Sequence, residues 1–262
     1  MSGPGSLVLR EDHGRVAILT LNQPHRLNAW SRAMEAEYFD QLEAIEAEPE
    51  IRAIVLTGAG RAFCAGADMA DLAAAASGGR KPEDQARPRH FPLSVGTPIV
   101  AALNGPVAAL GLVQALYCDV RFAAEDARMM TMFARRGLVA EFGISWLLVN
   151  TVGRGRALDL LLSGRTVSGA EAREIGLVEE VVPAERLLER ATAYATELAD
   201  LSSPYSIAQI KGQVGRDLER GFPESFEESR RLMAESLERE DVREGVASFV
   251  ERRPPRFDPW PG

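Results

Sequence analysis

Cysteine and histidine are scarce in this sequence, and basic charge does not dominate it. The 262 residues include two cysteines, Cys64 and Cys118, and three histidines, with no Cys-x-x-Cys pair. This pattern indicates neither a disulfide framework nor a metal site, and both cysteines are expected to be reduced and packed as small apolar groups. The net charge of −8 argues against nucleic acid as a partner, because phosphate binding needs a basic surface.

Long apolar runs are also lacking. No stretch is long enough to cross a bilayer, and the N-terminal MSGPGSLVLRED has no basic region followed by an apolar one, so no signal peptide is expected. The sequence therefore predicts a cytoplasmic protein that does not bind membranes. Its 46% hydrophobic content is enough for one large core, or for a core with a helical appendage.

Strands alternate with helices in the first half of the chain. Helical patterns cover residues 31–46, where Ser31 can cap the helix, and residues 110–117. This alternation is typical of parallel βαβ units. Four short runs rich in β-branched residues predict the strands, namely Arg15–Leu21, Ile51–Thr57, Pro98–Leu103 and Asp119–Ala123.

The second half is mainly helical in character. Helices are expected from Ser145 onward, including Ala184–Ala199 and a series of amphipathic helices over Pro204–Arg253. The Ala/Gly-rich and then Arg/Lys/Pro-rich segment Ala73–Pro92 is predicted to be a mobile loop that a ligand orders.

Two turns rich in small residues carry the chemical signal. TGAGRAFCAGADMADL (57–72) and ALNGPVAALGLVQALYCD (102–119) each read as a strand, a tight turn and a helix. Such turns direct backbone N–H groups toward an anion, and the helix N-terminus adds a partial positive charge. Most junctions of this kind serve packing only. No Gly-x-Ser-x-Gly, Walker A or His-Glu-x-x-His motif offers a competing chemistry.

These two segments resemble the signature segments of the enoyl-CoA hydratase/isomerase (crotonase) family. The resemblance extends to NQPHRLNAWS (22–31), LLLSGRTVSGAEAREIGLVEEVVP (160–183) and EDVREGVASFVERRPPRF (240–257), in the same order along nearly the whole chain. It implies an α/β fold, the crotonase (ClpP-like) spiral of ββα units over residues 1–200. A C-terminal helical trimerisation module would follow over residues 201–262, giving a homotrimer or a hexamer built as a dimer of trimers.

The resemblance also implies site residues for an acyl-CoA thioester substrate, with no metal and no cofactor beyond the coenzyme A of the substrate. The backbone N–H groups of Ala67 and Leu110 would form the oxyanion hole, and the CoA adenine would lie against the Ala65–Met69 backbone. Arg26, Arg252, Arg253 and Arg256 are candidates for the CoA phosphates, although each of them fits an ordinary solvated arginine equally well. The implied substrate-binding set is Arg26, Ala65, Gly66, Ala67, Asp68, Met69, Gly111, Phe133, Phe249 and Arg253.

The reaction depends on which acids are present. Val113 and Phe133 stand where family hydratases carry their two glutamates, whereas Glu141 stands where double-bond isomerases carry an acid. The sequence thus favours isomerisation by the single base Glu141, whose apolar neighbours would raise its pKa against the opposing effect of a helix N-terminus. Hydratase or other lyase activity, a thioesterase or decarboxylase, and a non-catalytic acyl-CoA-binding trimer remain as alternatives.

Other polar and aromatic residues near the motifs are given structural roles. Asp68 is expected to cap its helix, Asp71 to face solvent and Asp119 to support a strand. Trp146 and Phe133 are expected to fill the core or the acyl pocket.

Overall fold

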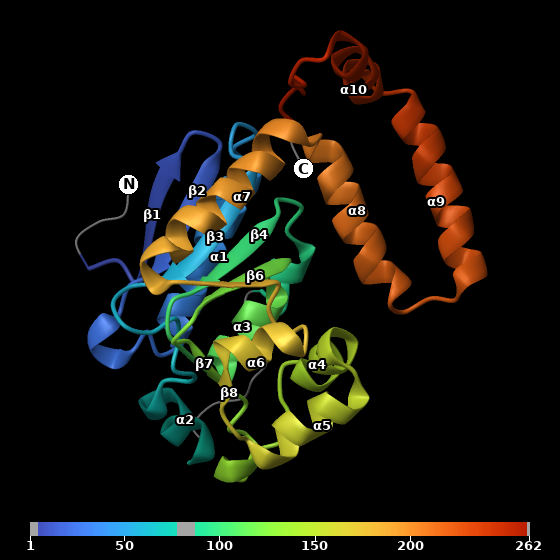
Figure 1. Ribbon diagram of the computed structural model, residues 1–262. Coiled ribbons are helices and arrows are strands. Elements are labelled where there is room, and N and C mark those ends of the chain that lie inside the picture. Colours follow the sequence, from blue (N-terminus) through green and yellow to red (C-terminus); the bar gives the residue numbers. More distant parts are fainter. Residues whose placement is uncertain (1–4, 78–86, 261–262) are drawn as a thin grey trace.

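A six-stranded sheet forms the centre of the computed structural model, which describes residues 5–77 and 87–260 (Figure 1). The strand order is β1-β2-β3-β4-β6-β9, with β1 antiparallel to β2 and every later pair parallel. The four predicted strands are all present in it. The strands are β1 Val8–His13, β2 Val16–Leu21, β3 Ala53–Gly58, β4 Ile99–Leu103, β6 Val120–Ala124 and β9 Glu180–Val182.

A second, three-stranded sheet lies beside the carboxyl end of this one. It consists of β5 Pro106–Ala108, β7 Arg128–Met130 and β8 Val167–Ser168, in that order. The sequence did not predict these strands, because two or three residues are too few to show an alternating pattern. Strands β1 and β9 were missed as well; β1 is an edge strand with a polar sequence, VLREDH.

Helices cover the six-stranded sheet. Helix α1 Arg32–Glu46 begins at Ser31, whose hydroxyl accepts a hydrogen bond from the Met34 N–H at 3.2 Å, and it buries Tyr38 and Leu42 against the core. Helix α7 Leu187–Leu201 packs across β2, β3 and β4 (Figure 1). The remaining helices of this region are α2 Met69–Ala76, α3 Leu110–Tyr117, α4 Ile144–Val152, α5 Arg154–Ser163 and α6 Gly169–Glu174.

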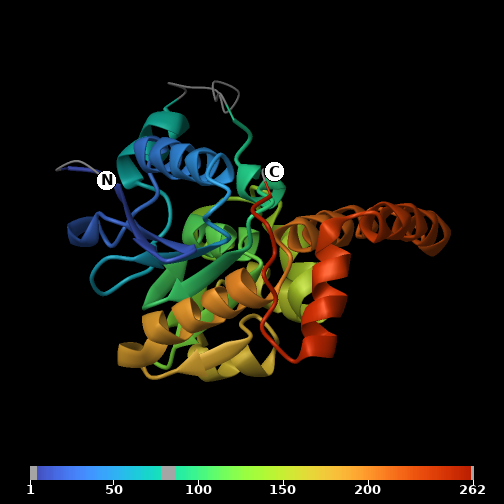
Figure 2. The same cartoon turned by 90° about the horizontal axis from the view of Figure 1, so that it is seen from above.

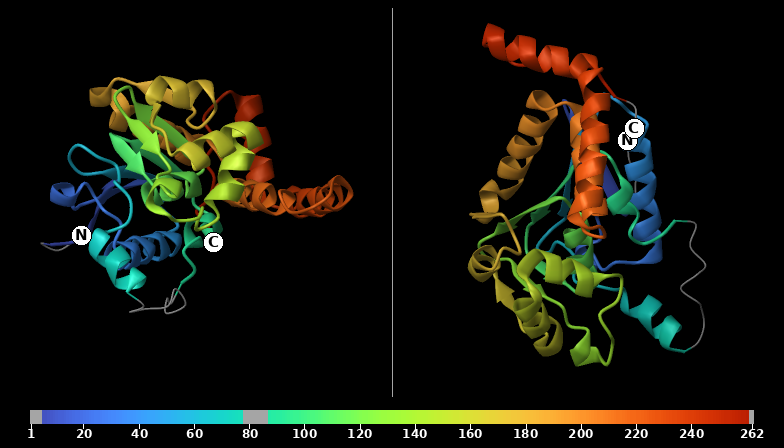
Figure 3. Two further views of the ribbon diagram at one scale, coloured as in Figure 1. Left: turned by 90° about the horizontal axis from the view of Figure 1, so that it is seen from below. Right: turned by 90° about the vertical axis from the view of Figure 1, so that its right-hand side faces the viewer.

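The last three helices form an arm that stands away from the sheet. Helix α8 Pro204–Asp217 leads to α9 Phe222–Leu237 and α10 Glu240–Glu251, and Figures 1 and 2 show α9 extending beyond the core. Figure 3 shows the same arm from two further sides. Its large apolar side chains are exposed to solvent, for example Phe222, Phe226, Met233, Val246 and Phe249. The predicted division near residue 200 falls between α7 and the arm and stays a prediction.

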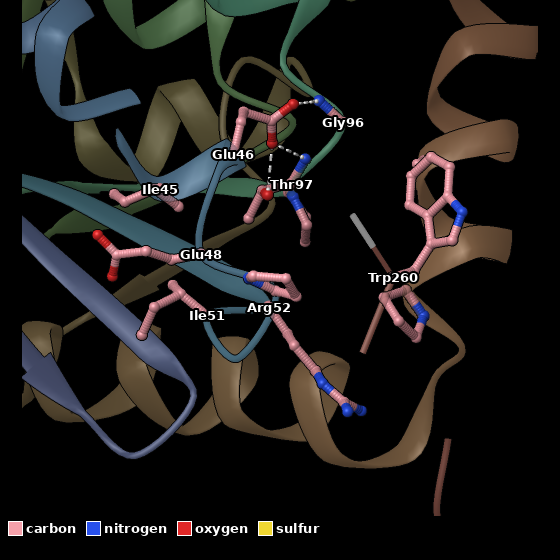
Figure 4. Close-up of a pocket in the computed structure, with 12 residues that line it drawn as sticks. Ile45, Glu46, Glu48, Ile51, Arg52, Gly96, Thr97 and Trp260 are labelled. Carbon is pink, nitrogen blue, oxygen red and sulfur yellow. Dashed lines mark hydrogen bonds between the residues drawn. The ribbon is translucent and has the colours of Figure 1, made fainter. Parts of the chain in front are cut away.

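The chain after α10 returns to the core. The Arg52 guanidinium donates a hydrogen bond to the Phe257 carbonyl at 2.8 Å, and the Trp260 ring meets Tyr205 edge-on at 5.5 Å. Figure 4 shows Trp260 and Arg52 at a small cavity of about 30 Å³, where the Glu46 carboxylate accepts hydrogen bonds from Gly96 and Thr97. The C-terminal segment therefore ties the arm to the core.

The predicted loop over Ala73–Pro92 is wrong at both of its ends. Helix α2 continues to Ala76, and Phe91–Ser94 forms a 3-10 helix. Residues 78–86 of this prediction lie outside the described part of the chain. Within residues 5–77 and 87–260, no helix has the length and apolar character needed to cross a membrane.

Candidate active site

The two signature turns run side by side. The Cys64 N–H donates to the Pro106 carbonyl at 3.2 Å and the Ala108 N–H to the Cys64 carbonyl at 3.0 Å, which pairs Cys64 with Val107 in a parallel bridge. The first turn, residues 64–68, leads into α2, and the second, residues 106–111, leads into α3. The sequence predicted two such turns at the ends of neighbouring strands, and the backbone bridge explains how they converge.

Glycine is required where the turns touch. A Cβ atom on Gly111 would lie 2.3 Å from the Cys64 carbonyl oxygen and 2.8 Å from the Cys64 Cβ, well inside van der Waals contact. Gly66 has φ +103, and a Cβ there would lie 3.0 Å from the Ala108 carbonyl oxygen. Both contacts join backbone to backbone, so the spacing of the turns does not depend on large side chains.

Ala67 and Leu110, the two residues implied for the oxyanion hole, line the same cavity. The bridge between Trp30 and Ala67 uses Trp30 N–H to Gly66 O (2.7 Å) and Asp68 N–H to Trp30 O (3.0 Å), so it leaves the amide of Ala67 itself outside the ladder. Leu110 is the first residue of α3, and its N–H therefore has no acceptor within the helix. Both residues line one cavity of about 150 Å³, where each donor would contribute about 3 kcal/mol to an oxyanion transition state.

Backbone strain marks Ala109, the residue that precedes Leu110. Ala109, the residue before α3, has φ 46 and ψ −113, a conformation that an L-residue adopts only at a cost of about 1–3 kcal/mol. The Ala109 carbonyl accepts hydrogen bonds from Leu112 and Val113 at 3.0 and 3.1 Å, which holds this conformation at the start of the helix.

The strain at Ala109 predicts opposite effects of two substitutions. Ala109→Gly is expected to keep full activity and to leave the melting temperature unchanged or slightly raised, since glycine adopts this conformation freely. Ala109→Val is expected to lower the free energy of unfolding by about 2 kcal/mol or more, because a β-branched residue at positive φ is strained further. Thermal unfolding of both variants measures this, and equal melting temperatures would contradict it.

Glu141 lines the same cavity as the two amide donors. The side chain is half-buried, and burial raises the pKa of its carboxyl above the ordinary value, while the nearby Arg89 guanidinium lowers it. The direction of the pKa shift agrees with the sequence-based expectation. The described lining of the cavity is Trp30, Arg32, Glu35, Ala67, Asp71, Leu72, Arg89, Leu110, Glu141 and Phe142.

The segment that carries Glu141 is fixed against α3. The Tyr117 hydroxyl donates a hydrogen bond to the Phe142 carbonyl at 2.8 Å, and burial raises the pKa of Tyr117 to about 12. Phe142 has φ 54 and Gly143 φ 73, and α4 begins only at Ile144, whose N–H donates to the Glu141 carbonyl at 3.2 Å. Glu141 therefore precedes the helix by three residues, which weakens the opposing effect of the helix N-terminus.

Sequence reasoning missed several residues of this cavity. Glu35 on α1 is 4% exposed, and its carboxylate accepts a hydrogen bond from Trp30 Nε1 at 2.9 Å. The available signal was its helical spacing with Tyr38 and Leu42 on the buried face of α1. No comparable signal marks Arg89, which belongs to the segment predicted to be a mobile loop.

The two positions at which family hydratases carry glutamates hold no acid in this chain. Val113 on α3 is fully buried, and Phe133 is 2% exposed within the core. Neither belongs to the described lining of the cavity. Asp119 has the expected structural role, because its carboxylate accepts the Ile99 N–H at 2.7 Å and pairs with Lys211 at 2.8 Å.

The residues implied for CoA fall into two groups. Near the cavity, Asp68 caps α2 through the Ala70 N–H at 2.8 Å and forms an ion pair with Arg26 at 2.8 Å, and Met69 is exposed. Ala65, Gly66 and Gly111 belong to the two turns. Asp71 is exposed, as expected, and its carboxylate accepts the Arg32 N–H at 3.2 Å.

The second group lies on or after α10, and none of its residues is among the described lining of the cavity. Phe249 is 85% exposed on the arm. Arg253 pairs with Glu244 and Glu251, both at 2.6 Å, and lowers the pKa of Glu244 to about 2. Arg252 ends α10 in a left-handed conformation, and the Arg256 N–H donates to Glu244.

A wider groove adjoins the cavity. It has a volume of about 630 Å³, and it shares Arg89 and Phe142 with the smaller cavity. Trp146, 42% exposed, lines this groove and is therefore not a core residue.

Comparisons with known proteins agree with this geometry. The sequence matches the enoyl-CoA hydratase/isomerase family over residues 11–259. It is 35% identical to a probable enoyl-CoA hydratase of Mycobacterium tuberculosis (95% of this chain, 97% of that protein) and 34% identical to 1,2-epoxyphenylacetyl-CoA isomerase of Escherichia coli (92% and 94%).

Solved structures agree as well. A probable enoyl-CoA hydratase/isomerase from Mycobacterium abscessus has a TM-score of 0.89 at 30% identity (97% of this chain, 99% of that one). An enoyl-CoA hydratase from Mycobacterium marinum has a TM-score of 0.71 at 48% identity (82% and 99%). The predicted crotonase fold is confirmed, and the chain belongs to the enoyl-CoA hydratase/isomerase family.

Proposed function

We propose that this enzyme moves a double bond in an acyl-CoA thioester, from 3-enoyl-CoA to 2-enoyl-CoA, with Glu141 as its single base. One observation carries the proposal: the Ala67 and Leu110 backbones and the Glu141 carboxylate line the same cavity. The two amides are suited to the thioester oxygen and the carboxylate to the acyl carbons beside it.

The proposed reaction proceeds in two proton transfers. Glu141 removes a proton from C2, and the electron pair of the C2–H bond moves toward the thioester oxygen, which becomes the oxygen of a dienolate held by the two N–H groups. The protonated Glu141 then returns the proton to C4. The C3–C4 double bond becomes a C2–C3 double bond, and no cofactor is needed beyond the CoA of the substrate.

A hydratase is the second candidate, and two observations favour it. The relatives that the sequence matches are mostly named enoyl-CoA hydratase. In addition, a second carboxylate, that of Glu35, lines the cavity with Glu141. Hydration needs one group to activate water and another to deliver a proton. The Glu35 carboxylate is already bonded to Trp30 Nε1 and lies near Arg89, so we place isomerisation first. A non-catalytic trimer is disfavoured because Glu141 is half-buried in the cavity rather than exposed.

The test is to supply the purified protein with 3-enoyl-CoA and, separately, with 2-enoyl-CoA. Double-bond migration and water addition are both followed by separating the products. Migration with little hydration supports the proposal. Rapid hydration with no migration contradicts it in favour of the hydratase, and turnover of neither substrate contradicts both.

We further propose that the arm is covered by other copies of this chain in a trimer or a dimer of trimers. The support is the exposed apolar face of α8–α10 and the family to which the chain belongs. Phe249 and Arg253 would then reach the CoA of a neighbouring copy. A solution mass of one chain would contradict this, and the cytoplasmic location also stays a prediction.

A further inference from the structure

Three charged side chains, those of Glu35, Arg89 and Glu141, line the same cavity. The Arg89 Nε atom lies 3.8 Å from Glu35 Oε1, and the Arg89 guanidinium stacks over the Phe142 ring at 4.4 Å. Phe142 follows Glu141 in the chain, and the positive charge of Arg89 lowers the pKa of the Glu141 carboxyl. Arg89 therefore interacts with both carboxylates of the cavity wall.

Glu35 is placed to hold this cation. Its side chain is 6% exposed and that of Arg89 is 21% exposed, so water screens their attraction only partly. The Glu35 carboxylate is fixed from the other side by Trp30 Nε1 at 2.9 Å. The backbone of the same Trp30 binds Gly66 and Asp68 on either side of the oxyanion donor Ala67, which joins Glu35 to the rigid part of the site.

We propose that Glu35 is a positioning residue, which holds the Arg89 guanidinium toward α1 and so limits the positive charge felt by Glu141. A base that removes a proton from C2 should have a pKa close to the working pH, and a guanidinium pairing directly with Glu141 would make it a weaker base. The effect of Glu35 on catalysis rests on the proposed function, in which Glu141 is the base. The effect of Glu35 on the pKa of Glu141 does not depend on that function.

Other charged and titratable groups face this region and belong in any account of its pH dependence. Each is left unchanged by the variants below. They are Arg32 from α1, Asp71 from α2, His90 beside Arg89, Tyr117 from α3, and Asp119, Lys211 and Glu219 along the adjoining groove.

The experiment titrates the Glu141 carboxyl directly, by carbon-13 NMR of glutamate-labelled protein, with the signal assigned through Glu141→Gln. Glu35→Gln keeps an oxygen that can accept the Trp30 N–H, so the fold should survive. We expect it to lower the pKa of Glu141 by roughly half a pH unit or more, because Arg89 is released toward Glu141. Arg89→Gln should shift the same pKa upward.

A double variant separates action through Arg89 from direct repulsion between the carboxylates. If Glu35 acts through Arg89, adding Glu35→Gln to the Arg89→Gln variant should change the pKa of Glu141 by less than half of the change that Glu35→Gln causes in the wild-type protein. A full shift there, or no shift in the single variant, overturns the proposal. Asp40→Asn removes an exposed carboxylate from the same helix and should leave the pKa of Glu141 unchanged.

The rate of double-bond migration against pH adds a functional measurement. Glu35→Gln should move the acidic limb of the pH–rate profile to lower pH, by the same amount as the pKa of Glu141 measured by NMR. Loss of water addition alone, with an unshifted Glu141 pKa, would make Glu35 a direct acid and overturn the positioning role. If Glu141→Gln remains active, the proposed function fails, but the NMR titration still decides the charge coupling.

Discussion

Replacing Glu141 by glutamine is expected to lower the rate of double-bond migration by about 10²- to 10⁴-fold. Glutamine fills the same volume and cannot take a proton from C2, while Ala67 and Leu110 remain in place to bind the thioester oxygen. Affinity for an unreactive acyl-CoA should therefore stay within about threefold of the wild type. Steady-state kinetics and a binding titration on the same preparation measure the two effects separately.

The pH dependence gives this prediction a second readout. The proposed base Glu141 must be ionised to accept a proton, and burial raises the pKa of its carboxyl. Activity should therefore fall as the pH drops through a value above that of an ordinary glutamate, and this acidic limb should vanish from the residual activity of Glu141→Gln. Glu174→Gln, an exposed substitution on α6, is the matched control and should behave as wild type. Full migration activity in Glu141→Gln would eliminate Glu141 as the base.

Gly111→Ala is expected to cost about 10²- to 10³-fold in kcat and about 2 kcal/mol in stability. The added Cβ would lie 2.3 Å from the Cys64 carbonyl oxygen, and both partners are backbone that cannot turn aside. The start of α3 must therefore shift away from the first turn. The Leu110 N–H is then expected to leave the position that the proposed oxyanion hole requires.

Gly155→Ala provides the control for this substitution. Gly155 lies in α5, and a Cβ there would meet no atom within 4 Å. Because alanine favours helix over glycine by about 1 kcal/mol, this variant should be as stable as the wild type or slightly more stable, with unchanged kcat. Thermal unfolding together with kinetics decides the matter. A Gly111→Ala protein that is destabilised but retains full kcat would show that the contact matters only for folding.

Local patterns in the sequence were sufficient to predict the strands and turns that carry the proposed oxyanion hole. The β-branched runs located β2, β3, β4 and β6, and the small-residue patterns located the two turns, whereas Ala67 and Leu110 were assigned through the family resemblance. The short strands β5 and β7 were not predictable, because long-range pairing rather than local pattern decides them. The burial of Glu35 and the approach of Arg89 likewise depend on how α1 packs against a segment more than fifty residues away. Glu141 was found through the family resemblance, and the structure supplied its neighbours.

The contact between the two turns also bears on how such enzymes diverge. Cys64, Gly66, Ala108 and Gly111 meet through main-chain atoms, so substitutions among the side chains of the surrounding wall leave the position of the two amides unaltered. Natural selection can then exchange the acids and the acyl contacts without rebuilding the proposed oxyanion hole. A probable enoyl-CoA hydratase and a 1,2-epoxyphenylacetyl-CoA isomerase accordingly stand at nearly equal sequence distance from this chain, 35% and 34% identity. Overall identity is therefore a poor guide to the reaction, and the few side chains around the amides are a better one.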